Sequence, residues 1–563
     1  MNEDIIINKL FDQLQKYHLK DFEIEINKLF KIKKNQNNFK LLNLYALFLE
    51  TKKEYNKAIS VFVKCIELNS KYPPPYFNLG RLYLHFKIYK SAINFLEKYL
   101  ELNQEGLFDA EYFLARAYYF NYEYQKSINL LKKVFSKHNK DISKSQKVEI
   151  LNLTGSAYTL NKDIENAINY YNEALNLDNT NVITLGNLAN ALRSQDKKAE
   201  ALEVFKKTLK LDPKNVHLHK DLSVIIKYKG KDDKHLKEML ELYNSNDLSN
   251  KDKADLGFAI GKAFDDMGSS KEASDYLIPS NNERRLQFKY DFENEIKEFQ
   301  VHSKLFSSLE KKVSKLKNQN NVTRPIFILG MPRSGTTLAE QILSSHSEVE
   351  AGDEIFFLAD SVQKSIPHKS LEDFSKNFLS HTEEKLKTLA NIYLSELDVI
   401  SKGKPNVTDK MPLNFKLIGL IYHSLPHAKI IHCARDGRDT CLSIYKNNFS
   451  TEKMAWAYDQ KELSSFFNLY VDYMKLWKKL YGNFIFDLHY ETVINDTENQ
   501  VRKLLNFCDL KFEDSCLNFY KNKRAVQTVS TMQVRQPIYS SSVKAWESYD
   551  PYMPGLFKNI NNY

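Results

Sequence analysis

Small side chains recur at intervals of twelve residues through the first half of this chain. The pairs are Ala46/Ala58, Gly80/Ala92, Ala115/Ser127, Gly155/Ala167, Ala189/Ala201 and Gly261/Ala273. The second members of successive pairs lie 34 residues apart in two cases, Ala58 to Ala92 and Ala167 to Ala201. Small residues at this spacing allow two antiparallel helices to approach closely where they cross, and large residues fill the space to the next pair. The first half of the chain is therefore predicted to be a stack of helical hairpins.

The period and the pattern of these pairs resemble those of tetratricopeptide repeats. Aromatic residues often follow the first small residue of a pair by three positions, and we expect them to pack in the core: Tyr83, Tyr118, Tyr158 and Phe264. One unit departs from the pattern, because Ser223 and His235 occupy its small positions. A solenoid of stacked helix pairs offers a concave surface to a peptide or protein. We therefore expect residues 1–277 to form an all-α solenoid that binds a protein or peptide partner.

Charge, apolar runs and cysteine usage exclude several classes of function. The net charge of +10 is mild for a chain of 563 residues, so we expect no nucleic-acid partner. No run reaches the roughly 18 apolar residues of a membrane span, so we expect no such span. The five cysteines are scattered and none forms a Cys-x-x-Cys pair, which predicts a reduced, cytoplasmic protein without zinc sites.

The second half of the chain contains the octapeptide GMPRSGTT, from Gly330 to Thr337. It follows an apolar run at 325–329, which predicts a strand, and it precedes a helical segment. A strand, a tight glycine turn and a helix start form a phosphate cradle, because backbone N–H groups and the helix dipole point at the anion. The spacing Gly-x-x-x-x-Gly is that of a P-loop, but Thr336 stands where a nucleotide triphosphatase needs a lysine. With Arg333 inside the loop, this indicates a different phosphate ligand.

Three further polar loops follow short β-rich runs at 406–408, 429–433 and 484–488. Such runs alternate with helical segments, which predicts an α/β domain over residues 323–563 with a parallel sheet and helices on both faces. In sheets of this kind, ligands bind beyond the carboxyl ends of the strands. All of these loops are therefore predicted to converge on one edge of the sheet. The lysine- and asparagine-rich stretch 278–322 is predicted to be a helical connector between the two domains.

Together these loops resemble the sulfotransferases, and more closely the branch that includes tyrosylprotein sulfotransferases and bacterial tetratricopeptide–sulfotransferase fusions. The resemblance covers nearly the whole chain and is carried by PRSGTT (332–337), GDE (352–354), DKMP (409–412), RDGRDTCLS (435–443) and SxxQVRxP (530–537). Members of this group transfer a sulfuryl group from 3′-phosphoadenosine 5′-phosphosulfate (PAPS) to a hydroxyl and release 3′,5′-ADP. The resemblance implies the same activity here, with a protein or peptide tyrosine as acceptor and the repeats recruiting it.

The resemblance also implies where PAPS binds. Arg333 suits the 5′-phosphosulfate together with the amides and hydroxyls of the residues that follow it, which are Ser334, Gly335, Thr336 and Thr337. Arg435 and Ser443, eight residues apart, match the subsite for the 3′-phosphate. Tyr490 matches a position near the adenine and the ribose.

For the reaction, the resemblance implies that Glu354 is the general base that removes the proton of the acceptor hydroxyl. Its neighbour Asp353 is the alternative. Lys410 matches the residue that stabilises the charge on the bridging oxygen of the leaving group, with Arg333 and Ser530 beside it. These fixed cations can act without a metal ion, and we expect no metal site.

Some features leave alternatives open. The family often has a lysine directly before a late tryptophan, whereas here Ala545 holds that position and Lys544 precedes it; no role is assigned to Lys544, Gln533 or Arg535. The acceptor can instead be a glycan or a small-molecule hydroxyl, because acceptor choice depends on loops that one sequence does not define. A hypothesis of another class is a repeat scaffold that carries an inactive nucleotide-binding domain. A P-loop kinase or triphosphatase is disfavoured by Thr336 in the lysine position.

Overall fold

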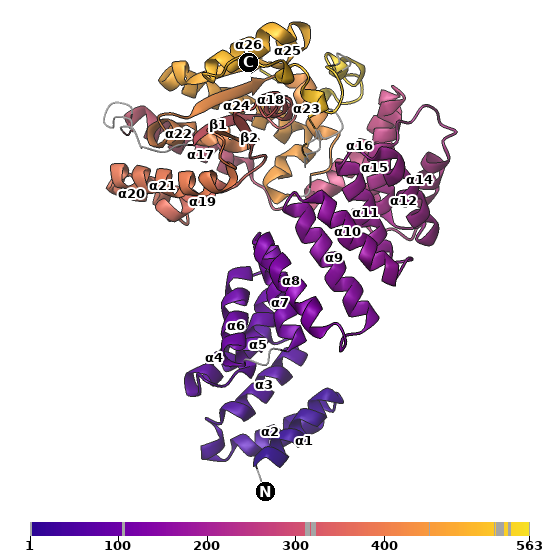
Figure 1. Cartoon of the computed structure of the whole chain (residues 1–563), viewed down its shortest axis with the longest axis vertical. Coiled ribbons are helices and arrows are strands. Elements are labelled where there is room, and N and C mark those ends of the chain that lie inside the picture. The colour runs from indigo at the N-terminus through magenta and orange to yellow at the C-terminus, as the bar shows by residue number, and fades with distance from the viewer. Residues whose placement is uncertain are drawn as a thin grey trace. The chain divides into compact units, whose positions relative to one another are not determined.

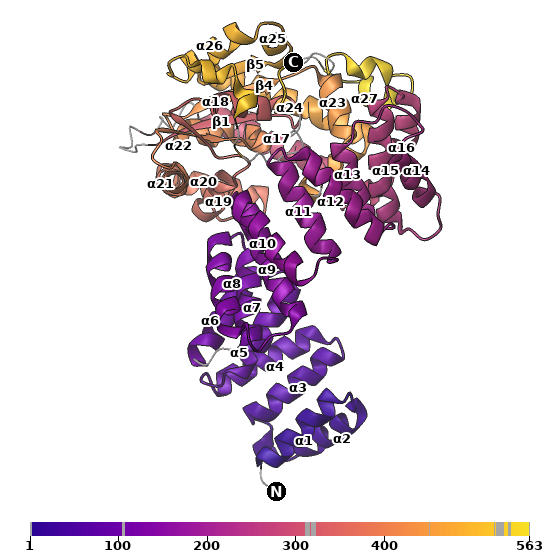
Figure 2. The same ribbon diagram turned by 45° about the vertical axis from the view of Figure 1, so that its right-hand side comes forward.

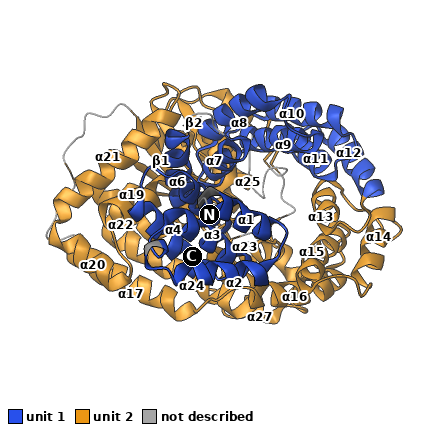
Figure 3. Ribbon diagram, turned by 90° about the horizontal axis from the view of Figure 1, so that it is seen from below, with its two compact units in different colours: residues 1–211 blue, residues 212–563 orange. Residues whose placement is uncertain are grey.

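The computed structural model of the chain divides into two compact units, residues 1–211 and residues 212–563 (Figure 3). The structure describes residues 3–103, 107–309, 316, 323–449, 451–522, 524, 534–538 and 542–561. Most contacts that a residue makes lie within its own unit, so each unit is described by itself.

The first unit is a run of helical hairpins (Figure 1). Its helices are α1 (Glu3–Gln15), α2 (Leu19–Phe30), η1 (Lys33–Asn35), α3 (Phe39–Thr51), α4 (Tyr55–Leu68), α5 (Pro74–His85), α6 (Tyr89–Leu102), α7 (Phe108–Phe120), α8 (Tyr124–His138), α9 (Lys144–Leu160), α10 (Ile164–Leu177), α11 (Val182–Ser194) and α12 (Lys198–Leu211). From α3 onward, each odd-numbered helix packs on the even-numbered helix that follows it. The predicted solenoid of helix pairs is confirmed in this unit.

The small residues stand where the helices of a pair cross. A Cβ atom added to Gly80 on α5 would lie 2.5 Å from Cγ of Leu96 on α6. At the next crossing the Ser127 hydroxyl donates a hydrogen bond to the Ala115 carbonyl at 2.8 Å. Close crossings of this kind leave no room for a larger side chain, which is the physical reason for the twelve-residue pattern.

The second unit opens with five helices, which are α13 (Val216–Ile225), α14 (Lys234–Tyr243), α15 (Asn250–Asp266), α16 (Ser270–Leu286) and α17 (Phe292–Leu309). The atypical repeat predicted from Ser223 and His235 forms the hairpin of α13 and α14. His235 is buried there, with Nε2 3.0 Å from His219 Nδ1 and Nδ1 2.7 Å from the Tyr228 hydroxyl. These hydrogen bonds explain how a large polar residue is accommodated in a position that other repeats fill with alanine.

Helices α15 and α16 continue the repeat pattern but belong to the packing unit of the C-terminal domain. Lys446 forms an ion pair with Asp265 at 2.9 Å, and Asn281 donates to the Tyr445 carbonyl at 3.0 Å. Arg285 pairs with Glu462 at 2.6 Å. These polar contacts join the last repeats to the domain that follows, so the two packing units meet at residue 211. The division by sequence at 277 and 322 remains a prediction about domain limits.

The C-terminal domain contains a parallel sheet of five strands in the order β2-β3-β1-β4-β5. The strands are β1 (Arg324–Gly330), β2 (Val349–Ala351), β3 (Asn406–Asp409), β4 (Lys429–Ala434) and β5 (Ile485–His489). Four of them confirm the strands predicted from apolar runs, and β2 was missed. Phe327 on β1 is in register with Asp409 on β3, and Gly330 with Cys433 on β4, so the loops that follow these three strands leave the same edge of the sheet.

Alternate residues of β1 face opposite layers of helices. Ile326 and Ile328 pack in a cluster with α18 (Thr336–Leu343) and α26 (Thr497–Phe507). Phe327 and Leu329 pack in a second cluster with α17 and the long helix α24 (Gln460–Tyr481). Figure 2 shows α25 (Tyr490–Asn495) and α26 on one side of the strands and α17 and α22 (Ile418–Ser424) on the other. The predicted α/β domain with helices on both faces of a parallel sheet is confirmed.

The remaining helices cover this sheet and its loops. They are α19 (Phe357–Ser365), α20 (Leu371–Ser380), α21 (Thr382–Ile400), η2 (Pro412–Leu417), α23 (Gly437–Tyr445), η3 (Glu452–Tyr458), η4 (Gly482–Phe484), η5 (Asp514–Cys516), η6 (Phe519–Lys521), η7 (Ala545–Ser548) and α27 (Pro554–Phe557).

Candidate active site

The turn between β1 and α18 has the backbone shape of an anion cradle. Gly330 and Gly335 have positive φ angles of 140° and 103°, and Arg333 also adopts the left-handed region at 69°. A Cβ atom on Gly330 would lie 2.5 Å from the Cys433 carbonyl oxygen, so only glycine fits against β4. Helix α18 begins directly after the turn, and its first N–H groups have no partner within the helix. The turn therefore presents backbone donors and the positive end of a helix dipole to an anion.

Two arginines, a tyrosine and a serine meet beside this turn. The Arg435 guanidinium lies 4.6 Å from the centre of the Tyr490 ring and donates to the carbonyls of Arg333 (3.1 Å) and Ser542 (2.6 Å). Tyr490 and Ser542 share a hydrogen bond between their hydroxyls at 2.8 Å. Arg333 Nε donates to the Ser443 hydroxyl at 3.0 Å. The structure thus brings together four residues that the sequence placed in one site, although they come from separate loops.

A pocket, here called the β1 pocket, opens between these groups; it has about 580 Å³ of empty volume, part of it open to solvent. Its polar wall consists of Arg333, Gly335, Thr336, Thr337, Arg435 and Tyr490, with Gln536. Its apolar wall consists of Leu338, Ile494, Phe519, Val534, Pro537 and Ile538. Cationic donors beside an apolar wall suit a ligand that joins an anionic group to a flat apolar ring. Ser334 and Ser443 belong to the same loops but do not line the pocket.

Some polar atoms at the site have no hydrogen-bond partner among the described residues. They are the Ser334 hydroxyl and Nε of Arg435, and both are buried. Buried polar atoms are bonded in the great majority of cases. Unused donors beside the turn of an anion cradle are therefore consistent with a bound anion.

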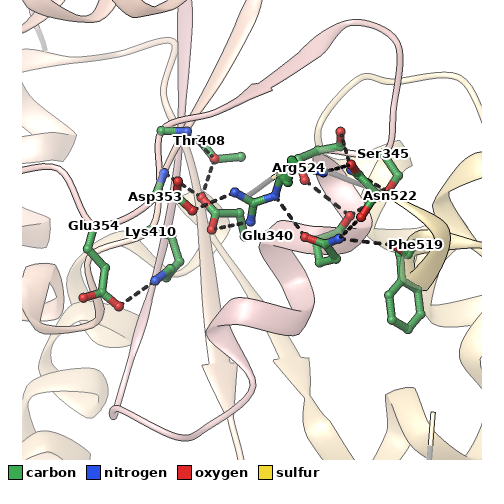
Figure 4. Close-up of polar contacts among 12 residues, drawn as sticks. Glu340, Ser345, Asp353, Glu354, Thr408, Lys410, Phe519, Asn522 and Arg524 are labelled. Atoms are coloured by element: carbon green, nitrogen blue, oxygen red, sulfur yellow. Dashed lines mark hydrogen bonds and ion pairs between the residues drawn. The ribbon is translucent and has the colours of Figure 1, made fainter. Parts of the chain in front are cut away.

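Glu354 and Lys410 form an ion pair at the same edge of the sheet (Figure 4). Lys410 follows β3, its side chain is fully buried, and its Nζ lies 2.6 Å from Oε1 of Glu354. The Glu354 side chain is 48% exposed and open to solvent. Neither residue lines the β1 pocket. The pair places a carboxylate that can accept a proton next to a cation that can stabilise developing negative charge.

A buried network that the sequence did not predict lies behind this pair. Arg524 donates to Glu340 on α18 at 3.0 Å and to Asp353 at 2.6 Å (Figure 4). The Asp353 N–H and the Thr408 hydroxyl both donate to Oε1 of Glu340, at 3.0 and 2.8 Å. Burial raises the pKa of the Glu340 carboxyl, and the charge of Arg524 opposes that shift. One sequence signal for the network was available, which is the acidic Glu340 inside the apolar helix segment TTLAEQIL.

This network separates the roles of the two neighbouring acids in the GDE segment. Asp353 is nearly buried and is bound by Arg524, whereas Glu354 is half-exposed and contacts Lys410. Gly352, before them, lies so close to β3 that an added Cβ would be 2.1 Å from the Thr408 carbonyl oxygen. The geometry favours Asp353 as a structural residue and leaves Glu354 as the carboxylate available to a ligand.

The loop that carries Lys410 is anchored by the buried residue before it. The hydroxyl of Tyr393 on α21 and the side-chain amide of Asn414 donate to the two oxygens of Asp409, at 3.1 and 3.2 Å. Burial raises the pKa of Asp409 to about 8.

The late segment of the chain is described only in part. Arg535 donates to the carbonyl of Arg524 at 2.8 Å, so it supports the backbone of the buried network. The Lys544 side chain is exposed, and its backbone N–H donates to Asp439 at 2.7 Å. Ser530 and Gln533 lie outside the described residues, so the prediction that Ser530 is catalytic stays a prediction.

Two features are absent from the described residues. That part of the chain contains no group of three or more His, Cys, Asp or Glu side chains that could hold a metal ion. It also contains no helix long and apolar enough to cross a membrane.

Comparison with known proteins agrees with this architecture. The model of the Sulfotransferase family matches residues 325–514. Models of the tetratricopeptide repeat match residues 39–72, 73–105, 148–181 and 183–211. The chain therefore contains tetratricopeptide repeats and a sulfotransferase-family domain, and the predicted resemblance is confirmed at this level.

Individual relatives are more distant or match only in part. An uncharacterised protein of Aquifex aeolicus is 32% identical over 66% of this chain and 49% of its own length. The protein-tyrosine sulfotransferase 1 of Danio rerio is 24% identical over 39% of this chain and 65% of its own length. The sulfotransferase domain of the Synechococcus PCC 7002 olefin synthase aligns with 42% of this chain and 91% of that domain, at 18% identity and a TM-score of 0.29. The chain thus spans about half the length of the first of these curated relatives and just under two thirds of the second.

Proposed function

We propose that this chain transfers a sulfuryl group from PAPS to the hydroxyl of a protein or peptide tyrosine. The observation that carries the proposal is the β1 pocket, in which a cationic turn rich in N–H groups adjoins an apolar wall. PAPS joins anionic phosphate and sulfate groups to a flat purine, so it needs both walls. The domain belongs to the sulfotransferase family. The identity of the donor and that of the acceptor are what we propose.

The donor would be held by the residues that the sequence singled out. Arg333 and the turn from Ser334 to Thr337 would bind the 5′-phosphosulfate, and Arg435 with Ser443 would bind the 3′-phosphate. Two observations support this assignment. Arg435 lies on Tyr490, at the wall where the purine and ribose would rest, and its Nε retains a donor without a partner among the described residues.

In the reaction, Glu354 would accept the proton of the acceptor hydroxyl while that oxygen attacks sulfur. The new bond is acceptor oxygen to sulfur, and the bond that breaks joins sulfur to the bridging oxygen of the 5′-phosphate. Lys410 would donate a hydrogen bond to that oxygen as negative charge develops, with Arg333 and Ser530 beside it. The 2.6 Å ion pair holds the Glu354 carboxylate beside the Lys410 side chain before an acceptor arrives. No metal ion takes part in the proposed chemistry.

A tyrosine acceptor is supported by the relatives whose names state protein-tyrosine sulfotransferase and by the tetratricopeptide repeats, which would recruit the acceptor protein. We also propose a cytoplasmic location. Its support is the set of five cysteines, all of which are buried, free thiols: Cys65, Cys433, Cys441, Cys508 and Cys516.

The test is transfer of ³⁵S from labelled PAPS to a pool of tyrosine-containing peptides by the full chain. We expect incorporation by the wild-type protein and a fall of about 10²-fold or more in Glu354→Gln, since that variant lacks the base. Label on glycans or small phenols in place of peptides would contradict the acceptor. Donor binding without transfer to any acceptor would favour the scaffold hypothesis, and magnesium-dependent ATP hydrolysis would favour a P-loop triphosphatase.

A further inference from the structure

The repeats of the first unit form a groove of their own, lined by α3, α5 and α7 and by the starts of α4 and α6. It encloses about 1170 Å³ of empty volume, part of it open to solvent. The helices α3, α5 and α7 hold equivalent positions in successive repeats (Figure 1). We refer to this hollow as the α3–α7 groove.

Cations outnumber acids along the α3–α7 groove. Arg81, Lys87 and Arg116 line it, and Glu50 is its one carboxylate among the described residues. Glu50 is already paired with Arg81 at 2.6 Å. Lys87 and Arg116 have no carboxylate partner within ion-pair distance in the described part of the chain. The groove therefore holds two uncompensated positive charges.

Aromatic rings line the groove beside these charges; Phe120 is exposed, and Tyr55, Tyr89 and Phe113 are half-buried. Tyr89 and Phe120 stack with ring centres 5.4 Å apart, and Phe120 remains 39% exposed. Phe113 lies below Arg116, whose guanidinium is 5.9 Å from the ring centre. Tyr55, from the start of α4, completes the aromatic lining. Rings in this setting can pack against an apolar or aromatic side chain of a ligand.

We propose that the α3–α7 groove binds an extended, acidic protein segment that carries an aromatic residue. The positive charge of the groove favours a segment with carboxylates, which would pair with Lys87 and Arg116. The rings of Tyr55, Phe113 and Phe120 would receive its aromatic side chain. This inference specifies the acceptor of the proposed function. Binding of the segment does not depend on that function, and only the later transfer of a sulfuryl group to the segment does.

The test is fluorescence anisotropy with the full chain, without PAPS, and with a labelled peptide of about eight residues in which Glu and Asp flank one tyrosine. We expect saturable binding that weakens as salt rises from 50 to 300 mM, because surface charges are screened. The same peptide with Gln and Asn in place of its acids should bind about tenfold more weakly. Replacement of its tyrosine by alanine should also weaken binding, by about threefold or more.

Charge reversal in the protein provides the matched comparison. The double variant Lys87→Glu, Arg116→Glu should lose about tenfold or more in affinity. The control, Lys206→Glu with Lys207→Glu, makes the same change in net charge at exposed positions of α12 outside the groove and should bind as the wild type does. Circular dichroism of each variant checks that its helices are intact, and Lys87→Gln with Arg116→Gln gives a milder change if reversal disturbs folding.

Equal affinity of the groove variant and the wild type would overturn the proposal. So would equal affinity for the acidic and the amide peptide, or displacement of the peptide by polyphosphate of matched charge regardless of the tyrosine. Because no donor is present, these results are independent of catalysis. Binding by the groove with no later transfer of sulfate would leave this inference standing and contradict the proposed function.

Discussion

Arg435 links the two ends of the proposed donor site, since it lies on the Tyr490 ring and holds the backbone of the P-loop-like turn through the Arg333 carbonyl. Two of its nitrogens donate to main-chain carbonyls, whereas its buried Nε has no hydrogen-bond partner among the described residues. In the proposed site, a single residue would thus shape the turn and offer charge to a phosphate.

We predict that Arg435→Ala weakens 3′,5′-ADP binding by about 1.5–3 kcal/mol, which is the range for a hydrogen bond to a charged group. Its affinity for 5′-AMP, which lacks the 3′-phosphate, should change much less. Isothermal titration calorimetry with both nucleotides makes the comparison. Arg438→Ala is the control, because Arg438 lies three residues away, stacks on Trp546 and does not line the pocket. Equal losses for both nucleotides would remove Arg435 from the 3′-phosphate subsite.

The residues of the site were largely predictable because most of them lie in short contiguous segments. Arg333 to Thr337 lie in and after one turn, Arg435 lies just before α23, and Ser443 lies within that helix. Arg524 was not predictable, since its partner Glu340 is 184 residues away along the chain. A buried charge of this kind is defined by the packing of two distant elements and not by any local pattern.

At the scale of elements, α18 is joined to the GDE loop by the buried ion pair of Glu340 and Arg524. Loss of the arginine would leave the Glu340 carboxylate buried without its partner. We predict that Arg524→Ala lowers the free energy of unfolding of the second unit by about 3–5 kcal/mol. Urea unfolding followed by tryptophan fluorescence measures this unit alone, because Trp456, Trp477 and Trp546 all belong to it.

The double variant Arg524→Ala, Glu340→Gln tests whether the unpaired Glu340 carboxylate causes the loss of stability. With a neutral side chain in place of the carboxylate, we expect more than half of the lost stability to return. Wild-type stability of Arg524→Ala alone would show that the network contributes little to the fold.

Helix α17 contacts α24 through the buried side chain of His302. We expect protonation of this histidine to lower the free energy of unfolding. Burial lowers the pKa of His302 to about 4, with Glu298 and Lys416 nearby, and its Nδ1 lies 3.1 Å from the Tyr473 hydroxyl. The folded protein therefore binds this proton less readily than the unfolded chain. The stability that neutral His302 contributes is complete above pH 6.5 and is lost as the pH falls toward 4.

Between pH 6.5 and 5 we expect His302 to remove about 2 kcal/mol from the free energy of unfolding of the second unit. His302→Gln keeps a polar side chain but does not titrate, so its stability should fall less over the same interval. Tryptophan fluorescence in urea at both pH values gives the difference. Parallel pH profiles of the two proteins would rule out His302 as the cause.

Elements were predicted well where their own sequence defines them. The apolar runs of β1, β3, β4 and β5 identified these strands. Strand β2 was missed because it has only three residues, Val349–Ala351, and includes a glutamate; its pairing with β3 defines it as a strand. The hairpin of α13 and α14 departed from the pattern because a hydrogen-bonded histidine takes the place of a small residue.

At the scale of the whole molecule, the chain has two packing units whose boundary does not coincide with the end of the repeat pattern. The twelve-residue pattern continues to Ala273, so it could not reveal that α15 and α16 pack with the sulfotransferase domain. Ion pairs such as Asp265 to Lys446, between residues far apart in sequence, determine that boundary.

We predict that residues 212–563 alone fold and transfer sulfate to a small phenol at a rate close to that of the full chain. Transfer to a protein acceptor should fall about tenfold or more, because the α3–α7 groove is absent. Steady-state assays with both acceptors measure the ratio. Equal loss on both acceptors would mean that residues 1–211 support the fold of the enzyme and do not recruit its substrate.

The central claim is that the β1 pocket holds an adenosine nucleotide by its 3′-phosphate as well as its 5′-end. The most direct measurement is calorimetric titration of the full chain with 3′,5′-ADP and, separately, with 5′-AMP. The account predicts one site per chain and an affinity for 3′,5′-ADP about tenfold or more above that for 5′-AMP. No binding of 3′,5′-ADP, or equal affinity for the two nucleotides, would contradict it.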